Sequence, residues 1–276
     1  MTIKQLAPQD AQFLYIQTAS SLTHIMGVYI FDPSTAPGGK VRFKDIIRHI
    51  ASRVDSSPVF KRRLHRLPMD FDHPYWVEDE YFDVEAHMLH SRLPEPGDWR
   101  QFCILTARHF SRPMDMNRPL WDIFIVEGLD RIEGVAPGSY ALLHRVHHAA
   151  IDGVSGAASF VAMSDIDAQG NPIVPMPAHP EPLGDEPSTA GIVSRAVRAN
   201  VTSPVKLMNA MLKFAPSVIS AAQRSVVTRN DGARGGVPET RFNAAISPHK
   251  AFEAAMFPLR EISELRQLVL GSTVND

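Results

Sequence analysis

The sequence predicts an α/β or α+β sandwich, and three observations point to this class. Segments with strand patterns and segments with helical spacing alternate irregularly, unlike the regular alternation of a doubly wound sheet. The run at residues 140–148 contains neither Gly nor Pro and is rich in apolar residues, as expected of a buried strand. The 276 residues, 44% hydrophobic and 21% charged, suffice for one large domain or two small ones.

The first part of the chain predicts a helix or turn, a strand and a longer helix. Residues 6–18 form the short helix or turn, and residues 21–32, which include HIMGVYIF, form the strand. Residues 43–54 have helical spacing, because Ile46, Ile50 and Val54 fall on one face and basic residues surround them. Residues 58–64 begin another extended run.

The middle of the chain predicts a strand and its exit at 74–84, a helix at 99–109 and a strand at 122–128. A hairpin with Gly and Pro then leads into the central strand at 140–148. Near the end of the sequence, residues 240–247 are predicted to be extended and residues 262–270 helical.

Composition excludes several classes of protein. A formal net charge of −2 gives no reason to expect a nucleic-acid partner. Cys103 is the single cysteine, so there is no disulfide framework and a reducing compartment is suitable. The start of the sequence has no apolar core of a signal peptide, and no apolar run reaches the ~18 residues of a spanning helix. We therefore expect a cytoplasmic protein whose contact with membranes is peripheral.

The candidate site lies where the predicted central strand ends, in HHAAIDG at residues 147–153. Neighbouring strand residues point to opposite faces, so one of His147 and His148 should do chemistry while the other packs. Asp152 is near enough to fix the turn or a histidine tautomer, and Gly153 suits a sharp turn. The alternatives are a buried histidine pair or a metal site. The sequence does not favour a metal, because no further His or Cys cluster has ligand spacing.

Two later segments differ from the rest in composition. Residues 166–187 are rich in proline and lack periodicity, as in a linker. Residues 188–230 are apolar and helix-like, with six Lys or Arg and no Asp or Glu. This is the composition of a membrane-surface segment. The alternative is a helix that lies across a partner domain with its basic side chains directed outward.

The chain also resembles a known family. HHxxxDG at His147 to Gly153 is the signature of acyltransferases with the chloramphenicol-acetyltransferase-like fold, which include the condensation domains of peptide synthetases. Flanking motifs in family order are similar to those of bacterial wax ester synthase/diacylglycerol acyltransferases. They are LAPQDAQFLYIQT at the start, His24-Ile25-Met26-Gly27, HPYWVED from His73, Pro119-Leu120-Trp121, TRFN from Thr240, and Thr273-Val274-Asn275-Asp276.

The resemblance implies a chloramphenicol-acetyltransferase-like half-domain, in which helices flank a mixed sheet. It also implies transfer of an acyl group from acyl-CoA, a co-substrate, to diacylglycerol or a long-chain alcohol, with no bound cofactor. His148 would be the general base, His147 would support it, and Asp152 would be structural, paired with an arginine. Gly153 would form the turn of the motif.

Two further motifs receive weaker roles from the resemblance. Asn275, beside Asp276, is a candidate for helping the oxyanion. Pro119, Leu120 and Trp121 are expected to shape the fold or an acyl pocket rather than to react.

Family members are longer, so the resemblance predicts the N-terminal portion of a two-domain enzyme. Residues 1–165 would be the half-domain with the motif, 166–187 the linker, 188–239 a helical basic and apolar connection, and 240–276 the start of the second half-domain. The missing half would be a partner, and residues 1–276 alone would be inactive. Attachment to the inner membrane or lipid droplets would be peripheral.

Two alternative functions remain open from the sequence. A condensation-type or polyketide-ester acyltransferase of the same fold would take its donor from a carrier protein. A non-catalytic lipid-droplet or membrane-binding protein would use the basic segment without needing the histidine motif.

Overall fold

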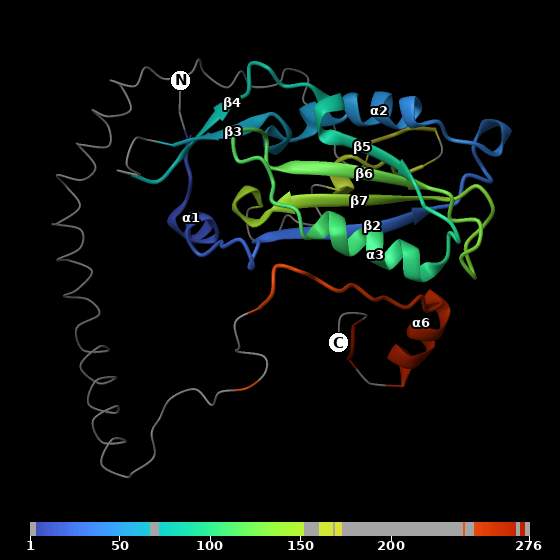
Figure 1. The fold of residues 1–276 in the computed structure, drawn as a ribbon. Helices are drawn as coiled ribbons and strands as arrows, with labels where there is room; N and C mark the ends of the chain where they lie inside the picture. Colours follow the sequence, from blue (N-terminus) through green and yellow to red (C-terminus); the bar gives the residue numbers. More distant parts are fainter. Residues whose placement is uncertain are drawn as a thin grey trace, which may run out of the picture.

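The computed structural model describes residues 4–66, 72–151, 160–167, 169–172, 240, 246–268 and 271–273. Its centre is a four-stranded sheet in the order β2-β7-β6-β5 (Figure 1). The strands are β2 (His24–Phe31), β7 (Tyr140–His147), β6 (Trp121–Glu127) and β5 (Met88–Arg92). β5 and β6 are parallel and the other pairs antiparallel, so the sheet is mixed. This confirms the predicted α/β sandwich.

β7 lies in the middle of the sheet, and its alternate residues enter two separate cores. Leu142 and Val146 belong to one apolar cluster, whereas Ala141 and Leu143 belong to the cluster on the opposite face. All four side chains are buried. A strand buried on both faces needs apolar residues at successive positions, which explains the continuous run in the sequence.

Three helices cover the sheet. α2 (Phe43–Ala51) directs Ile46 and Ile50 into the first cluster, which also takes Leu14 from α1 (Pro8–Tyr15). α3 (Trp99–Phe110) covers the opposite face with Phe102, and Figure 1 shows it lying across β2 and β7. α3 begins at an Asp98 cap, whose carboxylate accepts a hydrogen bond from the Gln101 N–H at 2.8 Å. The predicted helix at 99–109 is therefore confirmed, and the helix predicted at 43–54 is present but ends three residues earlier, at Ala51.

A smaller antiparallel sheet in the order β1-β4-β3 lies beside the main one. Its strands are β1 (Lys4–Gln5), β4 (Tyr75–Glu78) and β3 (Arg62–His65). The predicted extended run at 58–64 is only partly right. Pro58–Phe60 forms a 3-10 turn, because Pro58 fixes a helical φ and the Ser57 side chain accepts from the Val59 N–H.

The C-terminal described residues run along α3 and end in α6 (Leu259–Gln267) (Figure 1). The indole N–H of Trp99 donates to Glu253 Oε1 at 2.8 Å and to the Ala254 carbonyl at 3.1 Å, which fixes this segment to α3. α6 begins three residues earlier than the predicted helix at 262–270, directly after Pro258.

Several predicted features lie outside the described residues. They are most of the proline-rich linker, the basic segment at 188–230, most of the extended run at 240–247, and Asn275 with Asp276. The first residues of the predicted linker are described and form a tight turn, in which the Ile166 N–H donates to the Asn171 carbonyl at 2.7 Å.

Candidate active site

The histidine pair lies at the C-terminal end of β7, where the chain turns into the 3-10 helix η6 (His148–Ala150). Two backbone hydrogen bonds of 2.9 Å hold it there. The His147 N–H donates to the Leu120 carbonyl, and the His148 N–H donates to the carbonyl of Thr23. The main chain at both histidines is thus fixed by the segments that precede β6 and β2.

The ring of His147 is completely buried, and both of its nitrogens have partners. Nδ1 accepts a hydrogen bond from the Ala149 N–H at 3.1 Å, so the proton of the neutral ring is on Nε2. Nε2 lies 2.9 Å from Gln17 Oε1 and 3.1 Å from the hydroxyl of Thr23. That hydroxyl also lies 2.7 Å from the Phe13 carbonyl, to which it can donate while accepting from His147. One tautomer is therefore selected.

Burial, with the neighbouring His24 and His148, lowers the pKa of His147 to about 4. His24 stands directly opposite His147 in the β2–β7 register, and burial lowers its pKa to about 4 as well. Its Nε2 donates to the Phe110 carbonyl at 2.7 Å. At neutral pH both rings are uncharged, which suits histidines that hold a structure together.

The ring of His148 is in a different environment. It is only partly buried, and it stacks on the ring of Phe13 with a centroid distance of 4.1 Å and an interplanar angle of 13°. Phe13 comes from α1, so the N-terminal helix forms one wall of the site. The two histidines do separate into a packed ring and an accessible one. The backbone of His147 is still extended, so the two side chains leave the chain on opposite sides, and η6 begins at His148.

The Pro119-Leu120-Trp121 motif contributes to packing and to the position of the histidines. Leu120 and Trp121 are fully buried, and the Leu120 carbonyl accepts from His147. The indole N–H of Trp121 donates to the Phe60 carbonyl at 2.9 Å, and its ring stacks on His87 at 4.6 Å. A fully packed indole with its N–H satisfied acts through the fold.

A buried ionic cluster lies on the same face of β7 as His147, and sequence reasoning missed it. Arg145 Nε and Nη2 donate to the two oxygens of Asp122 at 3.0 and 2.5 Å. Nη1 of the same arginine donates to the carbonyls of His109 and Arg112 at 2.8 and 2.6 Å. Asp122 also contacts His109 Nε2 at 3.2 Å. Burial raises the pKa of Asp122, but His109 and Arg145 outweigh it and lower this pKa to about 2.

This cluster fixes the end of α3 to the strand that precedes the histidines. The signal for it was present as Asp122 and Arg145, two opposite charges inside otherwise apolar strands that face each other in the β6–β7 register. The resemblance predicted an arginine that pairs with Asp152. The guanidinium of Arg145 is engaged by Asp122, while Asp152 and Gly153 lie outside the described residues.

Cys103 lies on α3, away from the histidines. Its sulfur is buried, 3.6 Å from Glu253 Oε1. Burial and the carboxylate raise the pKa of this thiol to about 11, so it is protonated at neutral pH. In the part of the chain that the structure describes, no group of three or more His, Cys, Asp or Glu side chains is placed to hold a metal ion.

The mixed sheet flanked by helices, with a central strand that ends in the histidine pair, matches the fold class expected from the sequence, the chloramphenicol-acetyltransferase-like fold. Within that class the chain belongs to the wax ester synthase/diacylglycerol acyltransferase family, whose catalytic-domain model matches residues 6–276. The family resemblance found in the sequence is therefore confirmed.

Similar proteins agree with this assignment. A candidate diacylglycerol O-acyltransferase of Mycobacterium tuberculosis H37Rv is 32% identical over 288 residues, which cover 99% of this chain and 56% of the relative. Another candidate diacylglycerol O-acyltransferase of M. tuberculosis is 24% identical, with 96% of each chain covered. The solved wax ester synthase/diacylglycerol acyltransferase of Marinobacter aquaeolei VT8 matches 99% of this chain and 57% of its own, with a TM-score of 0.55 and 24% identity.

The chain thus spans about half the length of the first of these relatives and of the solved structure, and nearly all of the second relative. Among the helices of the described residues, none is long and apolar enough to cross a membrane.

Proposed function

We propose that the protein transfers an acyl group from acyl-CoA to the hydroxyl of diacylglycerol or of a long-chain alcohol, with His148 as the general base. The unequal environment of the two histidines carries this proposal. His147 is buried, fixed in one tautomer and uncharged. His148 is partly exposed, and within the described residues its ring nitrogens form no hydrogen bond. It is therefore the ring that can reach a substrate hydroxyl.

The reaction then needs one proton carrier. A neutral His148 takes the proton from the acceptor hydroxyl while the oxygen attacks the thioester carbonyl carbon. The C–S bond breaks as the tetrahedral intermediate collapses, and the imidazolium returns the proton to the coenzyme A sulfur. The products are the ester and coenzyme A. The stack on Phe13 restricts the ring to one plane, which favours a productive orientation for both transfers.

Direct attack on the thioester is the simpler route, because an acyl-enzyme would need a nucleophile near His148. Cys103, on α3, is protonated at neutral pH, and its thiol donates to the carboxylate of Glu253. The role of His147 in the proposal is support, since its hydrogen bonds hold the turn on which His148 lies.

The water-insoluble acceptors lead us to propose reversible attachment to membranes or lipid droplets as well. The composition of residues 188–230, with six basic and no acidic side chains, supports an electrostatic contribution. Flotation with neutral and anionic liposomes at low and high salt tests it. Binding that requires anionic lipid and weakens with salt is expected. Equal, salt-independent binding to both vesicles would contradict the electrostatic part.

The proposed activity is tested by coenzyme A release from palmitoyl-CoA with the full chain. Hexadecanol and diacylglycerol serve as separate acceptors, and the ester product is measured by mass spectrometry. We expect release that depends on acceptor and matches ester formation one to one. Ester formation only from a carrier-protein thioester would instead indicate a condensation-type enzyme. Vesicle binding with no transfer from either donor would indicate a binding protein.

A further inference from the structure

A second site lies at the other end of β7 from the histidines. A pocket of about 300 Å³ opens between α2, the sheet and the described segment at 160–165. Its apolar lining comes from six parts of the fold. These residues are Val41 before α2, Ile46 and Ile50 from α2, Phe31 from β2, Ile123 from β6, Tyr140 and Leu142 from β7, and Phe160 and Met163 from the segment at 160–165.

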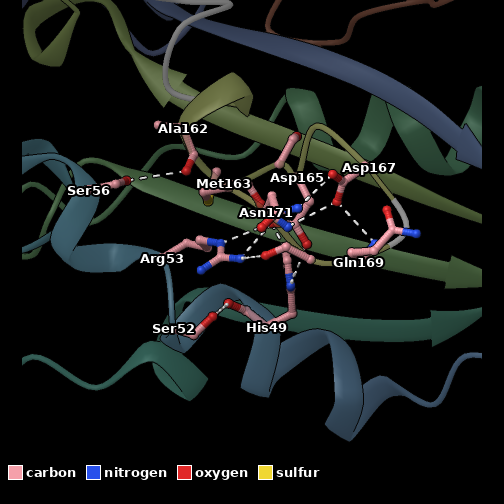
Figure 2. A network of polar contacts seen from close by, with 12 residues as sticks. His49, Ser52, Arg53, Ser56, Ala162, Met163, Asp165, Asp167, Gln169 and Asn171 are labelled. Carbon is pink, nitrogen blue, oxygen red and sulfur yellow. Dashed lines mark hydrogen bonds and ion pairs between the residues drawn. The ribbon is translucent and has the colours of Figure 1, made fainter. Parts of the chain in front are cut away.

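The segment at 160–165 is held over this pocket by polar contacts, which Figure 2 shows. Arg53 donates from Nε and Nη2 to Asp165 Oδ1 at 3.1 and 2.6 Å. His49 Nε2 donates to the Met163 carbonyl at 2.9 Å, and the hydroxyl of Ser56 donates to the Ala162 carbonyl at 3.3 Å. These contacts hold the segment against α2 and the residues that follow it, and the side chains of the described residues leave the space beneath it open.

The pocket is partly open to solvent, so it is a surface site and not a void within the packed core. A bound apolar molecule would remove its apolar walls from water, which is favourable. An engineered apolar cavity of ~150 Å³ stays dry and binds benzene. The present pocket has about twice that volume, which is at the lower end of the usual size of small-molecule sites.

The chemistry of the mouth restricts the ligand. Asp45, His49, Ser164 and Asp165 line it, and the carboxylates are already paired, Asp45 with Arg48 and Asp165 with Arg53. A hydroxyl can donate to either carboxylate, whereas a carboxylate head would meet the negative charge of Asp45 and Asp165. We propose that this pocket binds one unbranched alkyl chain with a neutral hydroxyl head, as a lipid site separate from the reaction centre.

The separation follows from the strand. Leu142 in the pocket and His148 are six residues apart, about 20 Å along an extended chain. If each carbon takes up the ~30 Å³ of one water molecule in the liquid, a chain of roughly ten carbons would fill the pocket. Such a chain would not reach the histidine. The inference therefore does not depend on the catalytic role of His148.

Alkanol binding to the full chain tests the proposal, measured by displacement of an environment-sensitive fluorescent alkyl probe. For a series of 1-alkanols, each added methylene should tighten Kd by roughly fourfold until about ten carbons, and longer chains should gain nothing more. Fatty acids should bind more weakly than 1-alkanols of equal chain length, because their head group is a carboxylate. Because 1-alkanols are also proposed acceptors at His148, the binding assigned to this pocket is the part that His148→Ala leaves unchanged and a substitution in the pocket lining removes. Affinity that rises without a plateau would overturn the site.

A matched pair of variants locates the binding. Leu142→Phe adds volume inside the pocket, so it should keep or raise the melting temperature and weaken alkanol binding at least tenfold. Leu143→Phe adds the same volume on the tightly packed opposite face of β7, so it should lower the melting temperature. Unchanged binding by folded Leu142→Phe would overturn the proposal. If Leu142→Phe does not fold, photo-labelling of the wild-type protein with a diazirine-bearing alkanol replaces this test, and the labelled residues are mapped. Labels must fall within residues 41–50, 140–142 or 160–165, and labels confined to the histidines or to other parts of the chain would overturn the site.

Discussion

The imidazole of His148 lies parallel to the phenyl ring of Phe13, with 4.1 Å between their centroids. The two residues are far apart in the sequence, and their contact joins the first helix to the end of the central strand. α1 therefore takes part in the site, beyond its contribution to the apolar core.

This stack gives the first prediction. Phe13→Leu keeps an apolar side chain but removes the flat surface that orients His148. Since a stacked pair is worth ~0.5–1.5 kcal/mol, kcat should fall roughly three- to tenfold, with KM little changed. Gln9→Ala, on the same helix and exposed, is the control and should behave as wild type. A folded Phe13→Leu enzyme with normal kcat would show that the stack does not orient the base.

The second prediction concerns the amide that holds His147. Gln17→Leu removes the nearer of the two acceptors of the buried Nε2–H and leaves only the Thr23 hydroxyl, so the free energy of unfolding should drop by about 0.5–1.5 kcal/mol. Gln12→Leu, on the exposed side of α1, should change it little. Urea unfolding measures both. Equal effects of the two substitutions would mean that the hydrogen bond is unimportant to the turn.

The third prediction tests the buried ion pair. Asp122→Asn leaves the guanidinium of Arg145 without its counter-charge, and breaking such a pair typically costs ~3–5 kcal/mol. Glu264→Gln, which breaks the exposed Arg260–Glu264 pair on α6, should have no measurable effect. Chemical denaturation compares them. If Asp122→Asn changed the free energy of unfolding only slightly, water must reach the cluster and screen the charge of Arg145.

The fourth prediction is a loss of stability in mild acid. Burial lowers the pKa of His24, His144 and His147 to about 4, whereas the unfolded chain binds these protons near pH 6.5. Between these values the unfolded state holds more protons, so the free energy of unfolding falls as the pH is lowered. Each histidine contributes a slope of at most ~1.4 kcal/mol per pH unit.

The variant His144→Leu checks this assignment. Nε2 of His144 is buried without a hydrogen-bond partner among the described residues, so its removal should not destabilise the protein at pH 7. Between pH 6.5 and 4 the free energy of unfolding should change less steeply with pH, by the contribution of one histidine. Denaturant midpoints across this range measure it, and an unchanged slope would contradict the origin proposed for it.

Local patterns in the sequence predicted much of the fold. The apolar run at 140–148 and the helical patterns at 43–54 and 99–109 are properties of neighbouring residues, so β7, α2 and α3 were found close to their observed bounds. The 3-10 turn at Pro58–Phe60 was missed because a short turn and an extended run differ little in pattern.

The residues that contact the site histidines and form the nearby ion pair could not be predicted in the same way. Gln17 reaches His147 across 130 positions of sequence, and Asp122 meets Arg145 only because β6 and β7 pair in one register. A single sequence carries no sign of such pairings beyond the presence of polar residues in apolar strands. The environment that distinguishes the two histidines depends on these contacts, so the structure was needed to describe it.

The most direct test of the account is kcat for coenzyme A release by His148→Ala and His147→Ala in the full chain, with circular dichroism to verify folding. Loss of a general base costs about 10²–10⁴-fold, and His148→Ala should fall in this range. His147→Ala should lose stability but retain more activity than His148→Ala. Near-normal turnover by His148→Ala, together with an inactive but folded His147→Ala, would contradict the assignment of the base.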